Sequence, residues 1–249
     1  MPDTVNPYIP GQPVDNPDLF FGRRELVTSL REHLLMGRRV FVVSGGQRMG
    51  KSSLLRQLPK HLPAEFLSVR VDLLDEGARS ANWLLWRLGD LIWHEVDQRL
   101  GLTGQGPALA EFEDGREVFT ERYWPEIRSA LGDRCLVLML DDLDSLADDG
   151  EEDVQGSLVS VLEELRRQDG TLALILSTSV TRQEVLLRRH GRLLGGSVSS
   201  LLGPLNSDEA TRLITWPVDG VLAYDYGVAR RMIEITSGQP YYLQLLCFE

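Results

Sequence analysis

The sequence has few of the residues that mark secreted, metal-binding or membrane proteins. It contains two cysteines and four histidines among 249 residues, and their spacing does not match a zinc site. Cys135 and Cys247 stand in apolar stretches, as the reduced thiols of a cytoplasmic protein do. The longest apolar runs, such as the one from Cys135 to Leu140, have only the length of a strand. We therefore expect a cytoplasmic protein with no membrane-spanning segment and no secretory signal.

Positive charge is also scarce, because 26 Lys and Arg residues face 37 Asp and Glu residues, a formal charge of −11. This balance argues against a chain that coats nucleic acid by itself. Eight acids and no basic residue lie between Asp141 and Asp153, so this segment carries −8 and the rest of the chain −3. Nucleic acid thus stays open as a partner, although the charge does not indicate it.

Proline and the hydrophobic pattern divide the chain into three parts. Five prolines in residues 1–19 predict an extended N-terminal arm. In residues 20–204, short apolar runs alternate with helical patterns, which predicts an α/β core with a mainly parallel five-stranded sheet flanked by helices. Residues 205–249 show only helical patterns and predict a partial helical lid that stops nine residues after Pro240. The expected strands are Val40–Ser44, Phe66–Leu73, Cys135–Leu140, Leu172–Leu176 and Val198–Leu202.

Residues 45–52 read Gly-Gly-Gln-Arg-Met-Gly-Lys-Ser and lie between a predicted strand and a predicted helix. This is the G-x-x-x-x-G-K-S pattern of a phosphate-binding loop, in which glycines let backbone N–H groups approach phosphate oxygens. Lys51 can reach the β- and γ-phosphates, and the Ser52 hydroxyl can ligate Mg²⁺. A plain glycine-rich turn is the alternative. The predicted nucleotide-contacting residues of this segment are Gly45, Gly46, Gln47, Arg48, Met49, Gly50, Lys51, Ser52 and Ser53.

Two acids, Asp141 and Asp142, end the apolar strand that begins at Cys135. We expect Asp141 to hold Mg²⁺ through a water molecule and Asp142 to act as the general base toward the attacking water. A glutamate more commonly reaches the attacking water, and an aspartate is one methylene shorter. Hydrolysis is therefore expected to be slow or dependent on a partner. Solvated carboxylates at a strand end are the alternative for both residues.

The next apolar strand, Leu172–Leu176, ends in Ser177 and Thr178. The carboxyl ends of parallel strands meet at one edge of the sheet, so this strand end faces the same crevice as the phosphate loop. We assign to Thr178 a hydrogen bond to the γ-phosphate or to the attacking water. Simple termination of the strand by polar residues is the alternative.

Together these features resemble the P-loop ATPases with an additional strand, the division that includes AAA+ proteins. Three further segments are similar to motifs of origin-recognition-like AAA+ proteins and of STAND signal-transduction ATPases. Phe20–Leu26 resembles the box that precedes the phosphate loop, Leu140–Asp144 resembles the two-acid strand end, and Gly238–Gln244 resembles the G-x-P motif of the lid.

The resemblance implies a role for four more residues. Phe21, Gly22 and Arg23 would lie beside the adenine, and Pro240 would contact the base or the ribose from the lid. From the residues alone, a hydrophobic staple stays open for the two phenylalanines, and a helix stop and restart stays open for the G-x-P segment.

The resemblance also implies a function: a P-loop ATPase that binds ATP or ADP with Mg²⁺, slowly hydrolyses the β–γ bond, and acts as a nucleotide-dependent molecular switch of STAND type. Its implied partners are a second copy of itself on ATP binding and an unidentified effector or sensor protein. The alternative is an origin-recognition-like or transposition-regulator AAA+ ATPase that acts on DNA, and a small-molecule P-loop kinase is a third hypothesis.

Overall fold

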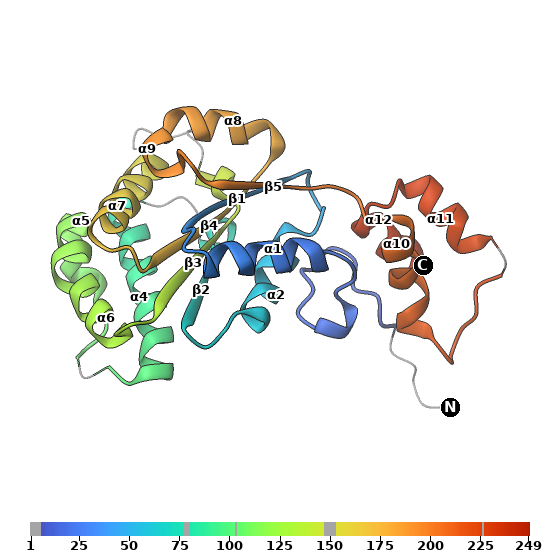
Figure 1. The fold of residues 1–249 in the computed structure, drawn as a ribbon, viewed down its shortest axis with the longest axis horizontal. Helices are drawn as coiled ribbons and strands as arrows, with labels where there is room; N and C mark the ends of the chain where they lie inside the picture. The colour runs from blue at the N-terminus through green and yellow to red at the C-terminus, as the bar shows by residue number, and fades with distance from the viewer. Residues whose placement is uncertain (1–5, 77–79, 103, 147–152, 226) are drawn as a thin grey trace.

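The computed structural model of the chain describes residues 6–76, 80–102, 104–146, 153–225 and 227–249 (Figure 1). In these ranges no helix is both long enough and apolar enough to cross a membrane. The described residues form an α/β core around one sheet and a group of three helices at its side (Figure 1).

The sheet has five parallel strands in the order β2-β3-β4-β1-β5, so the sequence prediction of a mainly parallel five-stranded sheet is confirmed. Every residue of β1, β3 and β4 is buried, because helices cover both faces of these central strands. In β5, at the edge, half-buried and exposed positions alternate instead, and only Leu202 is buried. The strands are β1 Val40–Gly45, β2 Phe66–Asp72, β3 Cys135–Asp141, β4 Leu172–Thr178 and β5 Val198–Leu202.

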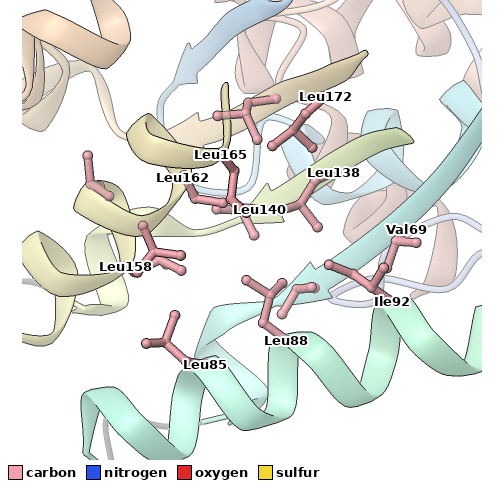
Figure 2. Close-up of a cluster of buried hydrophobic side chains, with 14 of the residues drawn as sticks. Val69, Leu85, Leu88, Ile92, Leu138, Leu140, Leu158, Leu162, Leu165 and Leu172 are labelled. Atoms are coloured by element: carbon pink, nitrogen blue, oxygen red, sulfur yellow. The ribbon is translucent and has the colours of Figure 1, made fainter. Parts of the chain in front are cut away.

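Two hydrophobic clusters hold helices against the two faces of the sheet. The larger cluster joins α4, α6 and α7 to one face, and Figure 2 shows leucines of α4 and α7 directed toward Val69, Leu138 and Leu140. The second cluster joins α1 and α2 to the opposite face through Phe41, Val43 and their neighbours. The helices of the core are α1 Arg24–Leu35, α2 Lys51–Gln57, α3 Leu73–Glu76, α4 Ala81–Leu100, α5 Gly115–Glu117, α6 Trp124–Leu131, α7 Val154–Gln168, α8 Val180–Arg189 and α9 Gly191–Leu194.

Local sequence signals explain where several helices begin and end. The Ser80 hydroxyl accepts a hydrogen bond from the backbone N–H of Trp83 and caps α4, as a serine before an amphipathic run predicts. Pro125 lies in the first turn of α6, where its missing N–H costs nothing, so the helical run before it ends there in a π turn.

The third hydrophobic cluster belongs to the lid helices α10 Ser207–Thr215, α11 Val228–Thr236 and α12 Pro240–Phe248, at the right of Figure 1. Leu205, Leu213, Ile214 and Leu243 form its buried centre. Phe21, from the segment before α1, packs against the same cluster. The lid therefore has a small core of its own and touches the chain that leads into the large core.

Candidate nucleotide-binding site

The loop between β1 and α2 connects a strand to a helix, as the G-x-x-x-x-G-K-S pattern predicts. Gly50 and Arg48 both have left-handed backbone conformations, with φ of +90° and +61°. A Cβ at Gly45 would lie 2.9 Å from the carbonyl oxygen of Leu202, so a larger residue does not fit between the two strands. The ammonium of Lys51 donates hydrogen bonds to the carbonyl oxygens of Gly45, at 3.0 Å, and Gly46, at 3.1 Å. The lysine thus lies directly over its own loop.

Asp141, the last residue of β3, is almost completely buried. Its Oδ1 accepts a hydrogen bond from the Ser177 hydroxyl at 2.7 Å. Its Oδ2 has no hydrogen-bond partner among the described residues. A buried carboxylate oxygen without a donor is costly unless a cation or water satisfies it, so the geometry fits a role toward Mg²⁺.

Asp142 follows with a left-handed backbone, φ +59°, and its N–H donates to the Ser177 hydroxyl at 2.8 Å. Burial raises the pKa of Asp142, the neighbouring carboxylate of Asp144 raises it further, and Lys51 opposes the rise. A carboxylate with a raised pKa accepts a proton more readily, which suits a general base. The left-handed turn redirects this side chain relative to the strand that precedes it.

The hydroxyl groups at the end of β4 contact the acids rather than the loop. Thr178 is fully buried, and its hydroxyl donates to Asp144 Oδ1 at 2.5 Å. The N–H of Ser179 donates to Asp144 Oδ2 at 2.7 Å. Asp144 was not assigned a role from the sequence, although it lies in the acidic segment. The contact of Thr178 with a γ-phosphate or water stays a prediction.

A cavity of about 600 Å³ opens in front of the loop and the acids, a size typical of small-molecule sites. The predicted residues that line it are Gln47, Arg48, Gly50, Lys51, Ser52, Ser53, Asp141, Asp142 and Pro240. Its lining does not include Gly45, Gly46, Met49, Phe21, Gly22, Arg23 or Thr178. The residues that sequence reasoning missed come from the arm (9–14), from the lid (Tyr241 and Gln244) and from Leu74, Asp144 and Ser179.

The N-terminal arm crosses this cavity and is anchored on both sides. Tyr8 is buried in the lid, where its hydroxyl donates to the carbonyl oxygen of Ile214. Val14 is buried in the core, where its N–H donates to the Ser53 hydroxyl at 3.0 Å and its carbonyl accepts from Gln57 at 2.7 Å. The prolines predicted an extended segment, but no signal in the sequence indicated where it would lie.

The segment of Phe21, Gly22 and Arg23 lies where the core meets the lid. The Arg23 guanidinium donates to the carbonyl oxygens of Gly203, at 2.5 Å, and Met49, at 3.3 Å. The Arg23 N–H donates to the Glu209 carboxylate of α10 at 3.3 Å. Burial lowers the pKa of Arg23, and Glu209 opposes this effect. Arg23 therefore joins the phosphate loop, the linker after β5 and the lid, and its predicted contact with adenine stays a prediction.

The lid also contacts the phosphate loop directly. The Gln239 amide donates to the carbonyl oxygen of Gln47 at 3.1 Å. The Arg48 guanidinium lies over the ring of Tyr241, 4.0 Å from its centroid, a cation–π contact. Pro240, between Gln239 and Tyr241 in the sequence, starts α12 and lines the cavity. The G-x-P segment is thus the part of the lid that reaches the site.

The donor set fits Mg²⁺ better than a metal held by protein side chains alone. Among the described residues, no group of three or more His, Cys, Asp or Glu side chains could hold a metal ion. Mg²⁺ with a nucleotide usually takes one or two protein oxygens and completes its shell with phosphates and water. Ser52 and Asp141 line the same cavity and offer such oxygens.

A family model described as novel STAND NTPase 1 matches residues 13–249. A Walker-type ATPase of Pyrococcus abyssi shares the fold with 18% identity and a TM-score of 0.74 over 96% of this chain and 69% of that one. Orc1 of Aeropyrum pernix, solved in complex with DNA, also shares the fold. The identity is 17% and the TM-score 0.58, over 93% of this chain and 60% of that one.

A STAND protein with a tetratricopeptide repeat sensor from Pyrococcus horikoshii is similar as well, with 18% identity and a TM-score of 0.55. That match covers 99% of this chain but 32% of the other. No curated protein matches. At these identities the solved structures establish the fold alone, the α/β fold of P-loop NTPases, and this chain spans only part of each of them.

Proposed function

This chain belongs to the novel STAND NTPase family, and from that membership we propose that it binds ATP and ADP with Mg²⁺ and acts as a nucleotide-dependent switch. The observation that carries the proposal is that the phosphate loop, the two acids, the arm and the lid line one cavity. A nucleotide there contacts the core through Lys51 and the lid through Pro240 and Tyr241. ATP and ADP can therefore favour different lid positions, because a ligand shifts a conformational equilibrium by its differential affinity for the two states.

We assign the chemistry to four residues of the cavity. Lys51 binds the β- and γ-phosphates, and Ser52 and Asp141 hold Mg²⁺, Asp141 through water. When bound, the metal neutralises charge on the transferred phosphoryl group. Asp142 accepts the proton of the attacking water, with its main chain held in place by Ser177. The short side chain of Asp142 supports slow or partner-stimulated hydrolysis.

We also propose that the parts of the chain act as separate bodies in this switch: an arm (1–19), a P-loop core (20–204) and a partial lid (205–249). The separate hydrophobic cluster of the lid supports this division, and Arg23 connects the core to the lid. ATP-dependent self-association, an effector or sensor protein and a cytoplasmic location stay predictions. An ATP-dependent shift of duplex DNA at low salt, lost as salt is raised, would instead favour the DNA-acting alternative.

Calorimetry with Mg·ATP and Mg·ADP, combined with a phosphate-release assay, tests the proposal. We expect Lys51→Ala to weaken binding about 30-fold or more, because it removes a charged hydrogen-bond donor to phosphate, and to abolish phosphate release. Lys60→Ala is the matched control, since Lys60 is the only other lysine of the sequence and does not line the cavity. Absence of binding heat for the wild-type chain with both nucleotides would reject the proposed function.

A further inference from the structure

One arginine approaches the acid end of β3 from the neighbouring strand. Arg70 is on β2, which pairs with β3 in a parallel register that sets Asp72 opposite Asp141. The Arg70 Nη1 lies 3.2 Å from Asp72 Oδ2 and 3.7 Å from Asp141 Oδ2. Arg70 itself does not line the cavity, and its side chain is about three-quarters buried.

The oxygen that Arg70 approaches is the one that lacks a donor. Asp141 Oδ1 is occupied by the Ser177 hydroxyl, whereas Oδ2 has no hydrogen-bond partner among the described residues. At 3.7 Å the guanidinium is too far for a good hydrogen bond but close enough for a strong charge interaction in a buried place. Asp141 Oδ2 thus faces a fixed positive charge, and its lone pairs carry no hydrogen bond within the described residues.

Charge balance shows what this arrangement leaves for a cation. The carboxylates of Asp72, Asp141, Asp142 and Asp144 stand against the two cations Arg70 and Lys51, a formal charge of −2. A divalent cation balances this charge, and any change at Arg70 alters the field that the cation meets at Asp141.

We propose that Arg70 is a positioning residue that holds the Asp141 carboxylate. Because the guanidinium and Mg²⁺ both interact with Asp141 Oδ2, Arg70 also sets the affinity of the site for Mg²⁺. This inference rests on the proposed nucleotide function. The guanidinium stabilises the buried carboxylate when no metal is bound, and its charge opposes the approach of Mg²⁺ to the same oxygen. Removal of that charge therefore strengthens Mg²⁺ binding, whereas Arg70→Lys keeps the charge and leaves the affinity for Mg²⁺ near that of the wild type.

The alternative is that Arg70 only pairs with Asp72 and joins the ends of two strands. In that case its replacement lowers stability but does not change how nucleotide binding depends on Mg²⁺. The dependence on Mg²⁺ concentration is therefore the measurement that separates a positioning role from a structural one.

The test measures ADP binding by calorimetry across a series of Mg²⁺ concentrations for the wild type, Arg70→Met, Arg70→Gln and Arg70→Lys. We expect the half-saturating Mg²⁺ concentration to fall about tenfold in Arg70→Met and Arg70→Gln and to stay near the wild-type value in Arg70→Lys. Arg116→Met is the matched control, because Arg116 pairs with Glu164 away from the cavity.

A thermal unfolding scan first shows which variants are folded, and Arg70→Gln, which keeps amide donors, provides a second neutral variant. An unchanged or higher half-saturating Mg²⁺ concentration in the folded neutral variants would overturn the inference. If the wild type binds neither ADP nor ATP at any Mg²⁺ concentration, the proposed function fails instead, so the two failures are distinguishable.

Discussion

Val14 donates its backbone N–H to the hydroxyl of Ser53, and the two atoms lie 3.0 Å apart. Val14 belongs to the N-terminal arm, and Ser53 belongs to the first turn of α2, two residues after the lysine of the phosphate loop. Both residues are buried. The contact ties the arm to the loop, so a change at Ser53 is expected to reach the arm.

Ser53→Ala removes the acceptor of a buried N–H and leaves that group unsatisfied. We expect a loss of about 1–3 kcal/mol in the free energy of unfolding. Hydrogen exchange at the Val14 amide should also become faster, because its protection depends on this bond. Chemical denaturation and amide exchange measure the two effects. The exposed Ser199 provides the control Ser199→Ala, for which a change within about 0.5 kcal/mol is expected. Unchanged protection at Val14 in the Ser53 variant would contradict this account.

Asp142→Asn tests the raised pKa of this carboxyl group. Between its ordinary pKa of about 3.9 and its raised value, the folded chain binds more protons than the unfolded chain. The free energy of unfolding therefore falls as the pH rises through this window, and the loss persists above it. Because asparagine does not ionise, the variant should be more stable than the wild type at pH 7, by a margin that shrinks toward pH 4.

Urea denaturation from pH 4 to 7 measures this difference, and Asp133→Asn, at an exposed turn, is the matched control. A stability margin that is constant with pH, or a variant less stable than the wild type at pH 7, would contradict this account. Either result would show that desolvation does not dominate the pKa of Asp142.

Gly22→Ala probes the junction between the core and the lid. Gly22 has a φ of +73°, and a Cβ there would lie 2.6 Å from the carboxyl carbon of Glu209. The substitution adds about 1–2 kcal/mol of backbone strain and displaces the carboxylate that accepts from the Arg23 N–H, worth about 1 kcal/mol more. We expect a total loss of about 2–3 kcal/mol in the free energy of unfolding.

Gly37→Ala is the matched control, since Gly37 has a φ of +84° and no atom near its Cβ position. It should show the backbone strain alone. Equal losses for the two variants in the same denaturation experiment would mean that Glu209 moves away at no cost and that the junction does not depend on this contact.

The candidate site was predicted best where its residues are close in sequence. The phosphate loop spans eight residues between a buried strand and a helix, and five of these eight residues line the cavity. The acids after β3 were found because they directly follow an apolar strand. The orientation of the Thr178 hydroxyl toward Asp144 was not predictable, since it depends on the turn after β3 and its left-handed Asp142.

The sequence by itself determined the phosphate loop, the acidic strand ends and the five parallel strands, because local motifs and hydrophobic periodicity encode them. Only the tertiary structure decided that the arm crosses the cavity, that Arg23 joins the loop to the lid, and that Arg70 faces Asp141. These contacts join residues that are far apart in the chain, and a long polar side chain or an extended segment has no periodic pattern. Their partners are set by the register of β2 on β3 and by the packing of the lid beside the core.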